Sequence, residues 1–158
     1  MSDRVNVDVS IEIQVAPAFT EVVSEDRLRR VVETVLQFEE EPGEVTVVVT
    51  DDEGIQELNR DFLGIDEPTD VLSFGTEKQS GPFVASPEAS RYLGDVIVSY
   101  PRAEEQAAEQ NYPVQRELDL LVVHGVLHLL GYDHAEEEEK VHMWTRQDDI
   151  LTNLWVGS

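Results

Sequence analysis

The stretch His-Gly-Val-Leu-His-Leu-Leu-Gly-Tyr-Asp-His occupies residues 124–134 and holds three of the four histidines of the chain. His124 and His128 are four residues apart, so on a helix they project from one face about a turn apart. Gly131 can take the left-handed conformation that ends a helix. A turn at this glycine would bring His134 back toward the same point. The stretch therefore predicts a helix and a turn that together present three imidazoles.

Three neutral imidazole nitrogens leave one tetrahedral position open, which is typical of catalytic zinc sites, whereas structural sites have four protein ligands. Zinc proteases with the pattern H-E-x-x-H-x-x-G-x-x-H share these histidines and the glycine. In this chain, however, Gly125 stands where those proteases have the glutamate that acts as general base. The stretch thus favours a zinc hydrolase over an ordinary metalloprotease. We interpret the remaining histidine, His142, as an ordinary core or surface residue.

The rest of the chain alternates between strand and helix patterns. Period-two or β-branched runs predict strands at residues 5–15, 45–49, 71–74 and 93–99. Helical periodicity and helix-start residues predict helices at residues 25–36, 51–63, 101–110, 113–128 and 136–155. We expect a single domain over residues 1–158 with an α/β or α+β fold, in which helices pack on a mixed four-stranded sheet.

Two helices carry further expectations. The histidine helix is apolar nearly all round, so it should be central and buried. The last helix has Val141, Trp144, Leu151 and Trp155 as its expected apolar stripe, after a run of glutamates at its start. Residues 75–91, with glycines, prolines and serines, are expected to form a flexible connection.

Composition narrows the class of protein. The chain has no cysteine, so it has neither a disulfide partner nor a thiolate ligand. No apolar run approaches the roughly 20 residues that span a membrane. The N-terminus lacks the basic and apolar regions of a signal peptide. We therefore expect a cytoplasmic protein that makes no membrane contact.

The net charge of −23 is far outside the magnitude of about 2 to 8 that is common for small domains. One interpretation is a protein that never meets nucleic acid. The other is adaptation to concentrated salt, because at about 1 M the Debye length is only about 3 Å and self-repulsion is screened. We favour salt adaptation because the acidic surplus runs along the whole chain. Net charge therefore does not exclude an RNA substrate.

Residues 124–134 resemble the His-Gly-x-Leu-His-Leu-x-Gly-Tyr-Asp-His stretch of the YbeY family, bacterial endoribonucleases of ribosomal RNA maturation. Residues 68–74 (Pro-Thr-Asp-Val-Leu-Ser-Phe) and 93–99 (Leu-Gly-Asp-Val-Ile-Val-Ser) agree with the family as well. The resemblance covers about residues 45–151. It implies a metal-dependent endonuclease specific for single-stranded RNA. It also implies roles at the 3′ end of 16S ribosomal RNA, on the small ribosomal subunit, and in ribosome quality control.

The resemblance implies one zinc ion per chain, with His124, His128 and His134 as its ligands. The family often has an arginine before the glycine that follows its L-N-x-x-aromatic stretch, whereas this chain has Leu63 there. Arg60, one helical turn earlier, is the candidate to replace it in RNA binding.

Side chains near these blocks are candidates for the remaining roles. Thr69 and Ser73 could contact phosphate, although each is also an ordinary turn or strand hydroxyl. The missing general base could be Asp133, Asp70 or Glu117. Asp133 could equally hold an imidazole in place. Glu117 precedes His124 by seven residues, which is roughly 10.5 Å along a helix and too far to touch the same metal.

Zinc lowers the pKa of a bound water from 15.7 to about 7. The residues do not choose between attack by such a water and attack by a ribose 2′-hydroxyl. Two other functions stay open: a zinc hydrolase of a non-RNA substrate such as a peptide or small amide, and a ribosome-assembly factor whose zinc is mainly structural.

Overall fold

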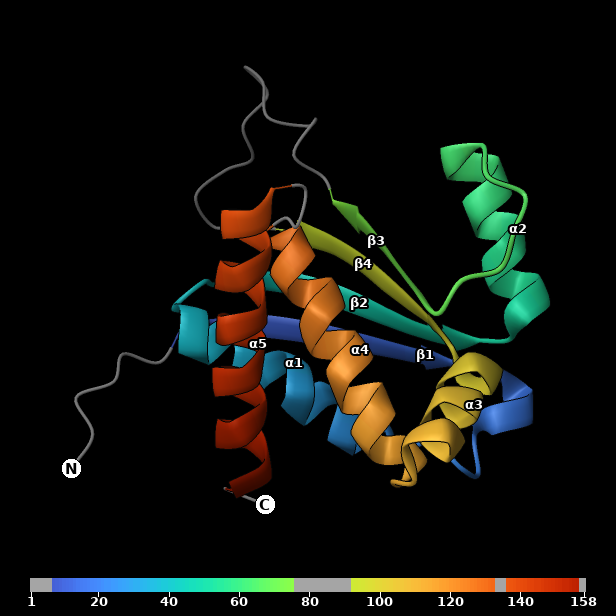
Figure 1. The fold of residues 1–158 in the computed structure, drawn as a ribbon, viewed down its shortest axis with the longest axis horizontal. Helices are drawn as coiled ribbons and strands as arrows, with labels where there is room; N and C mark the ends of the chain where they lie inside the picture. The colour runs from blue at the N-terminus through green and yellow to red at the C-terminus, as the bar shows by residue number, and fades with distance from the viewer. Residues whose placement is uncertain (1–6, 76–91, 133–135, 157–158) are drawn as a thin grey trace.

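The computed structural model describes residues 7–75, 92–132 and 136–156, and all structural statements concern these residues. Four strands form one sheet in the order β1-β2-β4-β3 (Figure 1). Their bounds are β1 (Val9–Val15), β2 (Gly43–Thr50), β3 (Val71–Gly75) and β4 (Tyr92–Ser99). β1, β2 and β4 run parallel, and β3 pairs antiparallel with β4 at the edge. The expected mixed four-stranded sheet is confirmed.

Five helices surround this sheet, which confirms the α+β class. They are α1 (Glu25–Glu39), α2 (Asp52–Leu63), α3 (Tyr100–Gln110), α4 (Val114–Leu129) and α5 (Glu137–Val156), and a short 3-10 turn covers Pro17–Phe19. α1, α4 and α5 lie together on one side of the sheet, and α2 lies apart from them beside β3 and β4 (Figure 1). Within the described ranges, none of the helices has the length and apolarity required to cross a membrane.

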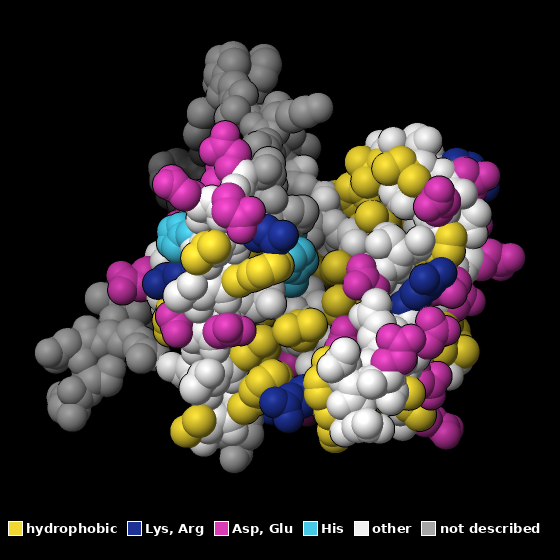
Figure 2. Space-filling model, viewed as in Figure 1, with side chains coloured by type: hydrophobic (Ala, Val, Ile, Leu, Met, Phe, Trp, Pro, Cys, Tyr) yellow, Lys and Arg dark blue, Asp and Glu magenta, His cyan; other side chains and the backbone are white. Residues whose placement is uncertain are grey.

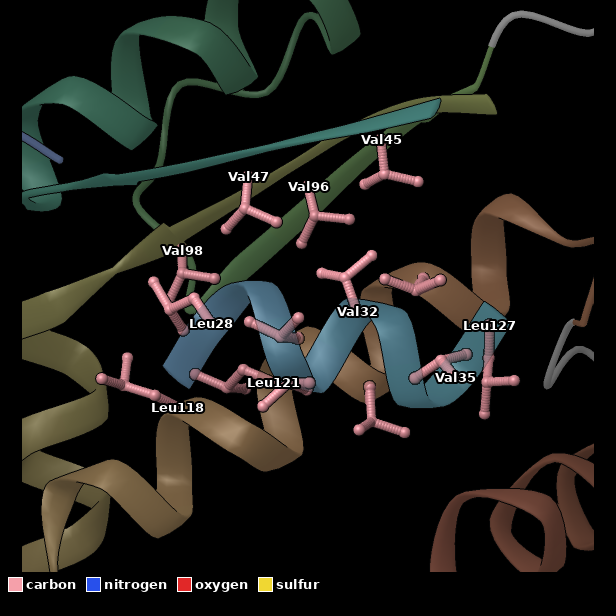
Figure 3. Close-up of a cluster of buried hydrophobic side chains, with 14 of the residues drawn as sticks. Leu28, Val32, Val35, Val45, Val47, Val96, Val98, Leu118, Leu121 and Leu127 are labelled. Carbon is pink, nitrogen blue, oxygen red and sulfur yellow. The ribbon is translucent and has the colours of Figure 1, made fainter. Parts of the chain in front are cut away.

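The larger core lies between the sheet and the layer of α1 and α4. Alternate side chains of β2 and β4 point into it because successive strand residues face opposite sides. Leucines and valines of α1 and α4 fill the space below them (Figure 3). The labelled core residues are Leu28, Val32, Val35, Val45, Val47, Val96, Val98, Leu118, Leu121 and Leu127. A smaller cluster under α2 holds the side chains that face the other way, Ile55, Leu72 and Ile97.

Helix ends follow the expected capping chemistry. The Ser24 hydroxyl accepts from the backbone N–H of Arg27 at 3.2 Å at the start of α1. At the start of α2 the cap is Asp51, whose carboxylate accepts from Gly54 N–H at 2.8 Å. Gly64 ends α2 in the left-handed conformation, with a φ of 74°.

The first strand is shorter than expected. It begins at Val9, and Val7 is held instead by the side-chain amide of Gln37. Gln37 accepts from Val7 N–H and donates to Val7 C=O, both at 3.0 Å. The predicted flexible connection lies almost entirely outside the described residues; of it, Gly75 belongs to β3.

The expected apolar stripe of α5 is only partly right. Leu151 is buried, but Val141 and Trp144 are 53% and 49% exposed. The buried face runs through Met143, Ile150, Leu151 and Leu154, because this side of α5 packs on α4 and α1. The N-terminal half of the helix therefore turns two large apolar side chains outward.

A buried carboxylate joins three helices at the other end of α5. Asp119 of α4 is 1% exposed and receives the guanidinium of Arg27 from α1 at 2.7 Å. The indole N–H of Trp155 from α5 donates to it at 2.9 Å, and so does the Gln115 amide. With several charge-assisted bonds the carboxylate is fully partnered, which makes its burial tolerable.

α4 approaches the sheet most closely at Gly125. A Cβ on this glycine would lie 2.6 Å from Cγ1 of Val96 and 3.2 Å from Oγ of Ser73. The Ser73 hydroxyl donates to the Gly125 carbonyl at 3.0 Å. On β4, Gly94 has a φ of 143°, a backbone conformation that glycine adopts more readily than other residues. A Cβ added at this position would collide with the carbonyl oxygen of Phe74. The expectation that α4 is central and buried is confirmed by these contacts.

We predict that Gly125→Ala lowers the free energy of unfolding by about 1–3 kcal/mol, the usual effect of overpacking a core. Helix propensity alone would make alanine about 1 kcal/mol more favourable than glycine. A net loss of stability in Gly125→Ala would therefore report the close contact itself. Urea unfolding in molar KCl, with the denaturant slope compared between variants, measures the change.

The matched control is the double variant Gly125→Ala/Val96→Ala, which removes the methyl group that the new Cβ would meet. The double variant should lose less stability than the sum of the two single variants. A Gly125→Ala protein as stable as the wild type, or strict additivity in the double variant, would contradict the prediction.

Candidate active site

The two histidines of α4 face each other at one wall of a cavity. Their Nε2 atoms are 3.2 Å apart, and their rings meet edge to face with centroids 4.7 Å apart. The cavity has a volume of about 420 Å³. It is lined by His124, His128 and Leu129 of α4, by Val71, Leu72, Ser73 and Gly75 of β3, and by Asp70. The edge strand and the histidine helix thus form one site.

Gln147 of α5 contacts the His124 ring. Its side-chain oxygen lies 3.0 Å from Nδ1 of His124. An amide oxygen can only accept a hydrogen bond, so this contact favours the tautomer with the proton on Nδ1, in which a neutral ring keeps its lone pair on Nε2. That lone pair points toward His128. Gln147 was not predicted from the sequence, because its role depends on how α5 packs against α4 and no local pattern carries this information.

The histidine pair fits a zinc ion in chemistry and in spacing. Two nitrogens at 2.0–2.1 Å from a tetrahedral zinc are about 3.3 Å apart, close to the 3.2 Å separation in this site. The predicted third ligand, His134, and the candidate base Asp133 lie outside the described residues. Within the part of the chain that is described, no three His, Asp or Glu side chains are grouped as a metal site.

The turn that precedes Asp133 and His134 is formed at Gly131. Gly131 has a φ of 103° and its N–H donates to the His128 carbonyl at 3.0 Å, which confirms the predicted turn. The Tyr132 hydroxyl then donates to Glu39 of α1 at 2.8 Å. Arg146 of α5 binds the other oxygen of Glu39 at 2.7 Å. Burial of the ring, followed by the bond to Glu39, raises the pKa of Tyr132.

Asp70 is the predicted base that the structure brings to the histidines. Its side chain accepts from Gln106 at 3.3 Å and from the Thr69 hydroxyl at 3.4 Å. Ser73 lines the same cavity, but its hydroxyl proton is used in the bond to Gly125. Thr69 contacts Asp70 rather than the histidines. Asp70 is thus the acid–base candidate, held by the Thr69 hydroxyl and the Gln106 amide.

Glu117 and Arg60 are not among the residues that line this cavity. Glu117 is buried in the first turn of α4, where it accepts a hydrogen bond from the Tyr112 hydroxyl. Arg60 is exposed on α2 and pairs with Asp61 at 3.1 Å, which raises the pKa of its guanidinium. Leu63, at the end of α2, is half-exposed.

Comparison with known proteins identifies the family of this chain. Residues 13–155 match the family model described as Endoribonuclease YbeY. The chain belongs to the YbeY family. The family resemblance indicated by the histidine stretch is therefore confirmed, and it extends over most of the sequence.

Several YbeY relatives cover nearly the whole chain. The Endoribonuclease YbeY of Roseiflexus sp. (strain RS-1) is 44% identical over 151 residues, which is 94% of each chain. That of Brevibacillus brevis is 46% identical over 134 residues, 80% of this chain and 84% of its own. The solution structure of a Thermotoga maritima protein is similar at 29% identity with a TM-score of 0.63, covering 93% of this chain and 90% of its own.

We predict that the imidazole of His124 in this YbeY chain is protonated at Nδ1 in the metal-free protein near pH 8. Long-range ¹H–¹⁵N spectra distinguish the two neutral tautomers. Gln147→Leu removes the acceptor and should produce a mixture of tautomers. Gln147→Asn, whose amide is one methylene short, is the matched control and should give an intermediate result. An Nδ1 tautomer that persists in Gln147→Leu would contradict the assignment.

We also predict a loss of stability between pH 10 and pH 12 that depends on Tyr112. Burial of the ring and the bond to Glu117 raise the pKa of Tyr112 to about 12, above the value of about 10 expected in the unfolded chain. The folded state then holds a proton that the unfolded state has released, so stability is complete below pH 10 and falls toward pH 12. Unfolding free energies measured across this range should fall less steeply in Tyr112→Phe.

Tyr92 provides the comparison, because burial and Asp95 raise the pKa of Tyr92 to about 12 as well. Tyr92→Phe should flatten the pH dependence to a similar degree, and the double variant should flatten it further. A double variant with the wild-type slope would show that neither phenol retains its proton.

Proposed function

We propose that this chain is an endoribonuclease that uses zinc to cut single-stranded RNA during ribosomal RNA maturation. The observation that carries the proposal is the His124–His128 pair, 3.2 Å apart in a cavity shared with Asp70. The family supports the same reaction class, since its model and relatives bear the name endoribonuclease. Neither a non-RNA zinc hydrolase nor an assembly factor with a structural zinc is favoured by these relatives.

The proposed cofactor is one zinc ion per chain, held by His124, His128 and His134. When bound, zinc would supply an acidified water and a positive charge beside the phosphoryl oxygens. The chain contributes orientation. Gln147 keeps the proton of His124 on Nδ1, so Nε2 is available as a ligand without rearrangement.

Proton transfer is assigned to Asp70. A general base must lie within hydrogen-bond reach of the proton that it removes, directly or through one water. Asp70 shares the cavity with the histidines, and two hydrogen bonds orient its carboxylate. Asp133, next to the proposed ligand His134, is the second candidate. Glu117 is the weakest, because Tyr112 occupies its carboxylate.

Substrate contacts are proposed along β3 and α2. Ser73 lines the cavity beside the histidines, where a phosphate or ribose would lie, and Thr69 adjoins this cavity through its contact with Asp70. Leu63 is uncharged and cannot form an ion pair with phosphate. Arg60, one helical turn earlier on α2, carries a permanent positive charge and is proposed to make this contact instead.

At the cellular level we propose that residues 1–158 act as one YbeY-like domain in the cytoplasm. The proposed partners are ribosomal RNA and the small ribosomal subunit, and the substrate is the 3′ end of 16S RNA. The acidic surface is consistent with a protein that acts in concentrated salt, where the electrostatic repulsion between protein and RNA is screened.

We predict that the zinc-loaded protein cuts a small-subunit RNA 3′ fragment in molar KCl, and that His128→Ala reduces cutting by at least 100-fold. Gel analysis of end-labelled RNA gives the rate, and metal analysis of the same samples gives the zinc content. Asp70→Asn should retain zinc and lose at least tenfold in rate, because general acid–base catalysis contributes about 10²–10⁴-fold.

His142→Ala is the matched control, since this α5 histidine contacts Tyr132 rather than the histidine pair. It should cut RNA at the wild-type rate. Zinc-loaded wild type that leaves every RNA intact would overturn the nuclease proposal. Equal cutting by wild type and folded His128→Ala would overturn the assignment of the site.

A further inference from the structure

An exposed aromatic side chain lies on α5 near the histidine pair. Trp144 is 49% exposed, and Val141, three residues earlier, is 53% exposed. Trp144 lies three residues before Gln147, which contacts His124, so the two side chains project from neighbouring positions of one helix face. In Figure 2, hydrophobic and basic side chains over the upper part of α5 lie next to a histidine side chain.

Lys140 completes this face. It is four residues before Trp144, and its Nζ lies 4.8 Å from the centroid of the indole ring. The chain has only two lysines, so a lysine here is not part of a general basic surface. An ammonium group over a tryptophan face is a favourable cation–π contact.

The charges around this face select the kind of ligand that it can take. Glu137, Glu138 and Glu139 are exposed in the first turn of α5, so phosphate groups are repelled there. Contacts to phosphate also weaken steeply as salt rises. A nucleobase carries no charge and stacks on an aromatic ring with little dependence on sequence. The flat, half-exposed indole therefore fits a base better than a phosphate.

We propose that Trp144 is a stacking platform for one base of the single-stranded RNA that enters the His124–His128 cavity. This rests on the proposed nuclease function and adds a substrate-binding residue to it. The base lies on the indole ring that Lys140 contacts. Stacking gives the protein a way to hold RNA despite a net charge of −23.

The test uses the fact that the chain has two tryptophans. Trp155 is bonded to Asp119 and covered by Arg116 at 4.3 Å, at the opposite end of α5. Trp155→Phe leaves Trp144 as the only emitter. Titration of this chelator-treated protein with a 2′-O-methyl oligonucleotide in molar KCl should quench its fluorescence in a saturable manner. The complementary Trp144→Phe protein, which emits from Trp155, should show no comparable quenching.

Affinity provides the second readout. Fluorescence anisotropy of a labelled oligonucleotide should show about tenfold weaker binding for Trp144→Ala, a loss typical of one stacked base. Trp144→Phe should recover most of the affinity. In cleavage assays Trp144→Ala should raise KM more than it lowers kcat. Val156→Ala removes an apolar side chain that is 80% exposed at the far end of α5, and this variant should bind as the wild type does.

The outcomes separate the two proposals. Wild-type affinity in Trp144→Ala, or quenching confined to Trp155, overturns the stacking platform even if RNA is cut. Quenching of Trp144 together with weaker binding by Trp144→Ala supports the platform, and the absence of cleavage in the same preparation would then count against the nuclease proposal alone.

Discussion

The close contact between α4 and the sheet at Gly125 is the constraint on which the rest of the structure depends. Only a residue without a side chain lets the helix approach the strand pair, where Val96 and Ser73 already fill the space. The Ser73 hydroxyl then ties the edge strand to the helix backbone. Because Gly125 lies between His124 and His128, the same contact brings both imidazoles to β3, the strand that Asp70 directly precedes. Core packing and site geometry are therefore one arrangement.

α5 provides the second level of support. Its buried end is fixed by Asp119, which gathers Arg27, Gln115 and Trp155 from three helices. With that end held, Gln147 reaches His124 and Arg146 reaches Glu39. The interior of this very acidic protein thus contains carboxylates matched by specific donors, while the unmatched acidic groups stay on the surface. Matching of this kind depends little on ionic strength, because buried pairs are poorly screened.

Much of the fold could be predicted because the patterns are local. The β-branched run of β2, the capping residues of α1 and the spacing of His124, His128 and Gly131 all depend on near neighbours in the sequence. The rest depends on tertiary packing. Gln147 acts only through the docking of α5. Trp144 satisfies helical periodicity as a core residue would, yet the helix is rotated so that Met143 is buried instead. Glu117, a candidate base by its position near the histidines, is taken by Tyr112, a bond that no spacing reveals.

Glu39 has a consequence for how the molecule opens. This single carboxylate, at the last turn of α1, is shared by Tyr132 and Arg146. Release of either partner leaves the other bound to a less ordered group, so the end of α1, the turn at Gly131 and Tyr132, and the middle of α5 should loosen together as one cooperative unit. Amide protons in these three regions would then exchange with solvent at a common rate, although they lie far apart in the sequence.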